Sequence, residues 1–213
     1  MKLNEITAPA LTPAQVEWLK DMRISYSVDS EGFVNVDGNV DISNKKLTSI
    51  PVKFGYVGGN FSCEHNNLTS LQGAPREVGG GVFCDFNKLT SLQGGPKEVG
   101  GGFYCSHNNL SSLQGAPREV GGGFFCSHNK LTSLQGAPRE VGGGFFCRHN
   151  KLTSLEGAPR EVGGSFWCGF NFLTSLQGAP REVGEEFNCY RNNFTSEPDH
   201  SFINIGGDFV WKE

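Results

Sequence analysis

Apolar residues recur along this chain with a period of 21 residues. One copy of the unit runs from Leu131 to Lys151 and holds two leucines, one valine and a Phe-x-Cys triplet at fixed phases. The two leucine columns are Leu68, Leu89, Leu110, Leu131, Leu152, Leu173 and Leu71, Leu92, Leu113, Leu134, Leu155, Leu176. A fixed period of this length is typical of a solenoid, in which each coil buries its apolar face only against its neighbours.

The Phe-x-Cys triplet alternates with a period of two, which predicts a strand with Phe and Cys inward and the middle residue outward. Proline and glycine recur at fixed positions of the repeat, for example at Pro138, Gly142 and Gly143. Both residue types interrupt helices, so a long helix between strands is not expected. We therefore predict one strand per coil, stacked in parallel at about 4.8 Å. About nine such coils, from Val40 to Trp211, would form a rod roughly 40 Å long.

Two further columns belong to the predicted interior. An asparagine follows each strand, and its side chain can both donate and accept, so a stacked column can satisfy the backbone of the turns above and below. This column is Asn66, Asn87, Asn108, Asn129, Asn150, Asn171 and Asn192. All the cysteines share one inward phase, at Cys63, Cys84, Cys105, Cys126, Cys147, Cys168 and Cys189. Their odd number, the absence of Cys-x-x-Cys and their linear order indicate reduced core residues, with no metal and no cofactor.

The ends of the chain depart from the repeat. We predict an N-terminal cap over residues 1–39, a solenoid over residues 40–197 and a C-terminal capping coil over residues 198–213. Inside the cap, a capping-box sequence opens a short helix over residues 12–22. Alternating residues on either side of a turn predict a hairpin over residues 24–36. A cap of this kind would cover strand edges and core that otherwise invite aggregation.

The pattern Asn-x-Leu-x-x-Leu-x-x-x-Pro-x-x-Val…Phe-x-Cys-x-x-Asn resembles leucine-rich repeats. It is most similar to the 21-residue leucine-rich-repeat-like proteins of tailed bacteriophages and some bacteria, whose phrases recur between Leu110 and Cys126. The resemblance covers about residues 39–211 and implies macromolecular binding, with a host-directed or accessory role. Gln135 stands where secreted bacterial effectors usually carry proline, and the ubiquitin-ligase domain of some effectors is not in the sequence, so that activity is not implied.

The predicted fold class is therefore mainly β: a right-handed leucine-rich-repeat-like β-solenoid of about nine coils with a small α/β N-terminal cap. Eighteen basic and 22 acidic residues give a net charge of −4, which argues against binding duplex nucleic acid. No apolar run is long enough to cross a membrane, and the segment from Met1 to Ala10 lacks the apolar core of a signal peptide. A cytoplasmic protein is expected.

The residue between Phe and Cys is the first candidate for function, because period two turns it toward solvent. This column is Phe83, Tyr104, Phe125, Phe146 and Trp167, bounded by Ser62 and Asn188. A contiguous exposed apolar patch usually marks an interaction site. The alternative is that the rings only stabilise adjacent strands, since cross-strand aromatic pairs contribute about 0.2–1 kcal/mol each.

Histidines line up in a neighbouring column, just before the asparagine, at His107, His128 and His149. The same phase carries phenylalanine in two coils, which favours packing at the turn over metal binding or shared titration near neutral pH. If these side chains are exposed, they extend the aromatic stripe into a broad patch with Arg148 and Lys151 at its edge. Aromatic and Arg side chains are enriched at binding hot spots.

The opposite side of each coil carries a column of Arg or Lys beside a column of Glu, nearly the same in every copy, which predicts a solvated face. No residue stands out as a nucleophile with a local base, so no catalytic residue is predicted. The function predicted is a non-enzymatic protein–protein interaction scaffold, phage-encoded and directed at a bacterial host protein in the host cytoplasm. The alternatives are homodimerisation through the aromatic face, or capture of a nucleotide-like molecule whose base stacks on the rings.

Overall fold

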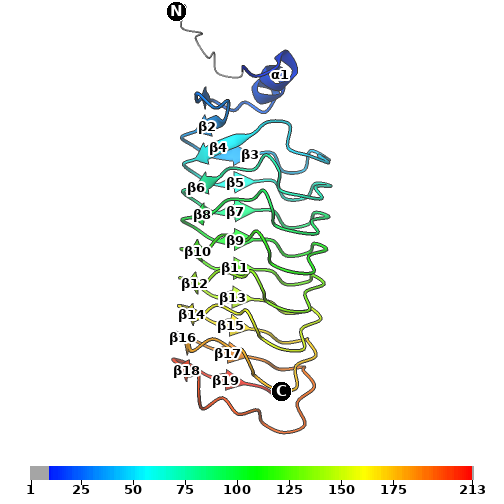
Figure 1. Ribbon diagram of the computed structural model, residues 1–213, viewed down its shortest axis with the longest axis vertical. Coiled ribbons are helices and arrows are strands. Elements are labelled where there is room, and N and C mark those ends of the chain that lie inside the picture. The colour runs from blue at the N-terminus through cyan, green and yellow to red at the C-terminus, as the bar shows by residue number, and fades with distance from the viewer. Residues whose placement is uncertain (1–9, 213) are drawn as a thin grey trace, which may run out of the picture.

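A computed structural model describes residues 10–212, so the first nine residues of the predicted cap, including most of the segment examined for a signal peptide, lie outside the described residues. The chain starts with helix α1 (Pro13–Asp21) and continues into a hairpin of β1 (Ser27–Val28) and β2 (Val34–Val36), as Figure 1 shows. Both elements lie where the sequence predicts them. The division into cap, solenoid and capping coil stays a prediction.

The start of α1 is held by the expected capping box. The side-chain oxygen of Thr12 accepts from the backbone N–H of Gln15, and the Gln15 side chain accepts from the backbone N–H of Thr12 at 2.9 Å. Gln15 also donates to the carbonyl of Pro51 at 2.9 Å, and Leu19 is fully buried in the core. These contacts fasten the helix to the first coil.

Two parallel sheets, not one, run the length of the rod (Figure 1). We call the first one the Glu-Val sheet; it begins with the hairpin strands β1 and β2. It continues with β4 (Phe54–Val57), β6 (Glu77–Val78), β8 (Glu98–Val99), β10 (Glu119–Val120), β12 (Glu140–Val141), β14 (Glu161–Val162), β16 (Glu182–Val183) and β18 (Asn204–Ile205). The aromatic sheet consists of β3 (Val40–Asp41), β5 (Phe61–Ser62), β7 (Val82–Phe83), β9 (Phe103–Tyr104), β11 (Phe124–Phe125), β13 (Phe145–Phe146), β15 (Phe166–Trp167), β17 (Phe187–Asn188) and β19 (Phe209–Val210).

The expectation of one strand per coil is therefore wrong. From β6 to β16 the second strand of the coil is a Glu-Val dipeptide, which is too short to show an alternating pattern in sequence. Its regular pairing, with Glu140 opposite Glu161 and Val141 opposite Val162, appears only when the coils are stacked. The nine strands of the aromatic sheet bound eight turns of the solenoid, in agreement with the predicted fold class of a mainly β, leucine-rich-repeat-like rod.

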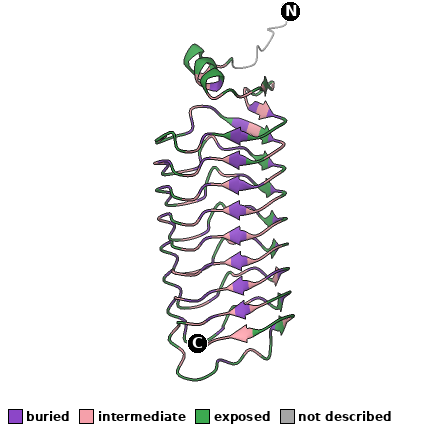
Figure 2. Cartoon of the chain, turned by 180° about the vertical axis from the view of Figure 1, so that it is seen from behind, coloured by how far each residue is buried: buried purple, intermediate pink, exposed green. Residues whose placement is uncertain are grey.

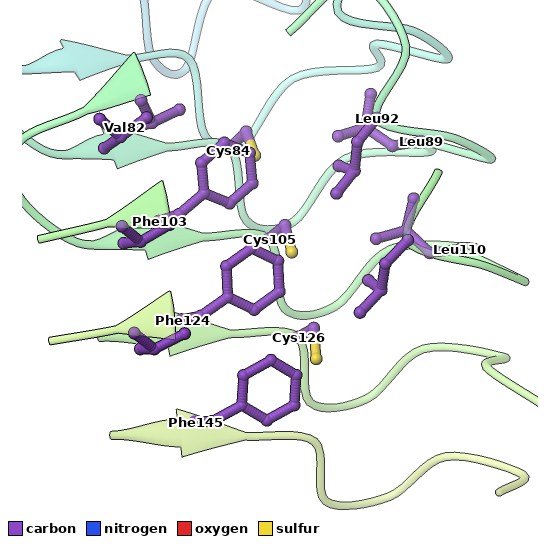
Figure 3. Packing of buried hydrophobic residues seen from close by; sticks show 14 of the residues in the cluster. Val82, Cys84, Leu89, Leu92, Phe103, Cys105, Leu110, Phe124, Cys126 and Phe145 are labelled. Atoms are coloured by element: carbon purple, nitrogen blue, oxygen red, sulfur yellow. The ribbon is translucent and has the colours of Figure 1, made fainter. Parts of the chain in front are cut away.

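The core lies between the two sheets and the leucine-bearing turns. In Figure 3 the rings of Phe103, Phe124 and Phe145 stack along the rod, with Cys105 and Cys126 beside them. Every cysteine, the inward phenylalanine of each strand that has one from β5 to β17, and both leucine columns are at most 2% exposed. Figure 2 shows the same burial repeating strand by strand, until the last strand, β19, is only half-buried. The inward direction of the thiols is confirmed.

The asparagine side chains form hydrogen bonds with backbone groups of the interior. The side-chain N–H₂ group of Asn129 donates to the carbonyls of Cys105 at 3.0 Å and Cys126 at 3.1 Å, and its oxygen accepts from the backbone N–H of Leu110 at 3.0 Å. One side chain thus ties two coils together and satisfies the carbonyls that end two strands of the aromatic sheet. The predicted structural role of this column is confirmed.

Candidate functional site

The candidate site is built on the outer surface of the aromatic sheet. We call the column Phe83, Tyr104, Phe125, Phe146 and Trp167 the ring ladder. Each of its side chains is half-buried, whereas Phe and Cys on either side of it are fully buried. The outward direction predicted by period two is therefore confirmed. The rings are not fully exposed, because each one covers its neighbour.

Successive members of the ring ladder stack almost in parallel. The ring centroids lie 4.6 Å apart between Phe83 and Tyr104, 4.4 Å between Tyr104 and Phe125, and 4.7 Å between Phe125 and Phe146. Trp167 breaks the order, since its ring meets Phe146 edge-on at 84°. The ladder thus stabilises the sheet and still shows the outer edges of its rings to solvent.

The histidine column forms a second ladder at the turn after each strand. We call it the turn ladder, and its members are His65, Phe86, His107, His128, His149 and Phe170. All of them have left-handed backbone, with φ between 52° and 55°, because the chain turns sharply there and sends the side chain outward. Neighbouring ring centroids are 4.1–4.5 Å apart.

Exposure decides how the turn ladder should be interpreted. His107 and His128 are exposed, Phe86 is 47% exposed, and His149 and Phe170 are half-buried. Packing at the turn therefore occurs between the ladder members themselves, and not against the core. The exposed edges extend the aromatic surface sideways, and the structure brings the two ladders together on one face.

Charges at this face are unevenly distributed along the rod. Lys151 is exposed, and the guanidinium carbon of Arg148 lies 4.8 Å from the centroid of Trp167, a cation–π contact. Burial, followed by the charges of His107, His149 and Arg148, lowers the pKa of His128. Burial and then Arg148 lower the pKa of His149. These imidazoles are therefore neutral at neutral pH and offer one donor and one acceptor each.

The N-terminal end of the same face is acidic. Glu64 and Asp85 occupy the phase that holds Arg148 four and three coils further on, and both are half-buried. Burial, followed after opposing backbone hydrogen bonds by the charge of Glu64, raises the pKa of Asp85 to about 6. These two acids are not among the site residues predicted from the sequence. The sequence does contain a signal for them, because their column changes from acidic to basic along the repeat.

Three side-chain atoms in the described part of the chain are buried without a hydrogen-bond partner. They are an oxygen of Glu64, Nε of Arg148 and the indole nitrogen of Trp167. All three belong to the outer face of the aromatic sheet. A buried polar atom without a partner destabilises the free protein by about 1–3 kcal/mol, so this face is incompletely satisfied by the chain itself.

The Glu-Val sheet presents a different surface, which the sequence analysis treated only as a solvated face. A shallow groove of about 1360 Å³ runs along it, lined by the glutamates, the valines and the glycines that follow them, such as Glu140, Val141 and Gly142. Its ion pairs are local and exposed, at 4.0 Å between Arg118 and Glu119 and 3.5 Å between Arg160 and Glu161. The groove repeats the same residues in nearly every coil.

The described residues contain no group of three or more His, Cys, Asp or Glu side chains placed to hold a metal ion. Burial raises the pKa of the cysteine thiols, for Cys189 to about 12, so the thiols stay protonated and are poor nucleophiles or ligands. Among residues 10–212 no helix combines the length and apolar character needed to cross a membrane.

Comparison with known proteins adds a structural likeness. No known family model matches the chain, and no curated protein sequence matches it. Among solved structures, the chain is similar to YopM from Yersinia enterocolitica WA-314, with a TM-score of 0.31 and 13% sequence identity. The alignment covers 82% of this chain and 64% of YopM, so the chain spans less than two thirds of that protein. The description of the fold rests on the repeat and on the two parallel sheets.

Proposed function

We propose that this protein is a non-enzymatic protein-binding scaffold whose partner docks on the outer face of the aromatic sheet. The docking residues are Phe83, Tyr104, Phe125, Phe146, Trp167, His107, His128, His149, Arg148 and Lys151. The observation that carries the proposal is the pair of aromatic ladders, which lie side by side over successive coils and keep their ring edges open to solvent.

The composition of this face supports binding. Tyr, Trp and Arg dominate binding hot spots, and Tyr104, Trp167 and Arg148 all lie here. The rings are also held in place before any partner arrives, because each is fixed between two neighbours. Binding would therefore cost little side-chain entropy, which favours affinity.

The geometry favours a macromolecule over a nucleotide-like molecule. A base that stacks on an aromatic side chain needs a free ring face. Within the stacked parts of the ladders the ring faces cover one another at 4.1–4.7 Å, so no base fits between them without pulling the coils apart. Trp167 meets Phe146 edge-on instead, and the guanidinium of Arg148 lies over its ring. Ring edges and imidazole nitrogens in a long row suit a broad protein surface instead.

The finer part of the proposal rests on the sequence resemblance to phage-encoded repeat proteins. We propose that the partner is a protein of a bacterial host, met in the host cytoplasm, and that the role is accessory or directed against the host. The protonated, buried cysteines are compatible with a reducing compartment.

The test is capture of a partner from bacterial lysate by the immobilised protein, followed by binding measurements with the purified partner. Removing two rings in the Phe146→Ala/Trp167→Ala variant should weaken capture at least about tenfold, because hot-spot aromatics carry most of the binding energy. The fold should be retained, which circular dichroism would verify. The matched control is Arg139→Ala/Glu140→Ala on the Glu-Val face, expected to bind as the original. Equal capture by the ring variant would refute the proposal.

A further inference from the structure

We propose that the occupant of the aromatic face is a second copy of this chain, in a two-fold dimer with the rods antiparallel. The two-fold axis would run parallel to the strands, between β9 and β11. This inference rests on the proposed function, since it uses the same docking surface; the second copy occupies that surface until a foreign partner takes its place. It commits to one occupant because the face is complementary to its own reverse.

Charge is the first argument. The column Glu64, Asp85, Ser106, Ser127, Arg148, Gly169 is acidic at one end, neutral in the middle and basic toward the other end. Turning a second copy end over end about the proposed axis keeps each column opposite itself and reverses its order. Asp85, which follows β7, then faces Arg148 of the second copy, which follows β13. Each dimer contains this ion pair twice, as an isologous interface requires.

Register is the second argument. In the strand order β5-β7-β9-β11-β13-β15, the point between β9 and β11 is equally far from β7 and β13, and also from β5 and β15. The same axis that pairs Asp85 with Arg148 therefore brings Glu64 to the coil of Trp167. It also sets Phe83 against Phe146 and Tyr104 against Phe125, so the ring ladders meet along their edges. One axis matches all of these residues. It also sets Lys88 opposite Lys151, but both lysines are exposed, where like charges interact weakly.

The unpartnered atoms are the third argument. The acceptor, on Glu64, lies toward one end of the face, and the two donors, on Arg148 and Trp167, lie toward the other. Reversal of the second copy brings acceptor and donors to the same ends. Small rotations of the side chains would then give each atom a partner of opposite hydrogen-bonding sense, and Asp85 would gain a cation near its carboxylate. A parallel arrangement of the rods would set like against like.

The size of the face sets the strength expected. Six strands from β5 to β15 at about 4.8 Å span roughly 29 Å, and about six residues across each coil at about 3.3 Å span roughly 20 Å. About 600 Å² per chain, or about 1,200 Å² in total, would be buried, which is at the lower end for specific interfaces. We therefore expect a dimer with micromolar dissociation constant, visible in its dependence on concentration.

The test is analytical ultracentrifugation of the purified protein over a range of concentrations around micromolar. The original chain should sediment as a reversible dimer. Arg148→Glu and Asp85→Arg should each weaken the dimer at least about tenfold, because each places like charges opposite one another twice. Both variants should fold, since the same column already holds an acid at Glu64 and an arginine at Arg148.

The decisive measurement mixes the two variants. An Arg148→Glu chain and an Asp85→Arg chain restore opposite charges at both positions, so a heterodimer should form as tightly as the original dimer. The double variant Asp85→Arg/Arg148→Glu should likewise recover a homodimer. The control is Arg139→Glu, an exposed charge reversal on the Glu-Val face, which should leave the dimer unchanged.

Three outcomes would overturn the dimer: a monomeric original chain at all concentrations, single variants that sediment as the original, or a mixture that stays monomeric. The outcome for the proposed function is separate. A monomeric chain that still loses a foreign partner in the Phe146→Ala/Trp167→Ala variant would overturn the dimer and keep the docking face.

Discussion

The two sheets share one core and the same parallel stacking of coils, yet their outer faces differ. On the Glu-Val sheet the strands β6 to β16 carry glutamate outward in every coil. On the aromatic sheet the outward residue of β5 to β17 changes from coil to coil, in the order Ser62, Phe83, Tyr104, Phe125, Phe146, Trp167, Asn188. Because the same parallel pairing supports both, the fold does not require the variation. The difference favours the face whose residues vary as the proposed docking surface.

Electrostatics distinguishes the faces as well. The glutamates of the Glu-Val sheet lie in register, which is unfavourable, and the adjacent Arg and Lys column offsets their repulsion. Each pair is exposed and contributes little to stability. On the aromatic face the half-buried charges are few and sorted by sign along the rod, with Glu64 and Asp85 at one end and Arg148 toward the other. Such a pattern has a direction, whereas the opposite face has none.

The largest expected effect removes the core that both faces share. Leu131 is fully buried, so Leu131→Ala should lower the free energy of unfolding by about 2–5 kcal/mol and weaken both faces together. Urea denaturation followed by circular dichroism would measure this. Thr132→Ala, the exposed next residue, is the control and should change stability by less than about 0.5 kcal/mol. A loss as small as that for Leu131→Ala would mean that the faces do not depend on a common interior.

A smaller effect on stability is expected at Gly142, the residue that follows strand β12 of the Glu-Val sheet. A Cβ atom at Gly142 would overlap the carbonyl oxygen of Gly121 in the preceding coil. Gly142→Ala should therefore lower stability by about 1–3 kcal/mol. The matched variant is Gly38→Ala, where a Cβ meets nothing within 4 Å. Thermal melts of the two would show whether the constancy of this face reflects close stacking of coils; equal melting temperatures would argue against it.

The smallest effect concerns the acidic end of the aromatic face and depends on pH. The pKa of Asp85 is about 6 in the folded chain, above its ordinary value of 3.8, so the folded state binds this proton more tightly than the unfolded state. This contribution to stability is present below about pH 4 and is lost as pH rises through about 6. Asp85→Asn keeps the oxygen that accepts from Ser106 and removes the charge, so at pH 7 the monomer should gain on the order of 1 kcal/mol.

Denaturation at pH 5 and pH 7 under dilute, monomeric conditions would check this. Between these values the original chain should lose stability relative to Asp85→Asn as pH rises. Glu140→Gln, on the opposite face, is the comparison variant. If stability changed with pH in the same way for Asp85→Asn and for the original chain, the carboxyl of Asp85 would not have a raised pKa in the folded protein.

Much of the fold was readable from local phase. Cys126 and Phe124 are inward because they alternate with Phe125, and Asn129 is buried because every coil repeats it at a strand end. The second sheet could not be predicted from the sequence, because a strand such as Glu140-Val141 has only two residues and shows no alternating pattern. The exposure of His128 could not be predicted for a related reason. The direction of its side chain depends on a left-handed turn of the backbone, which a histidine in the sequence does not indicate.

The sequence by itself determined the period, the inward columns and the contrast between a constant and a varying face, because these follow from spacing along the chain. Only the tertiary structure decided that rings 21 residues apart cover one another's faces, and that Glu64, Arg148 and Trp167 carry atoms without partners. The physical reason is that these properties belong to neighbours in adjacent coils. Their distances and side-chain angles arise when the coils stack, and no stretch of sequence contains them.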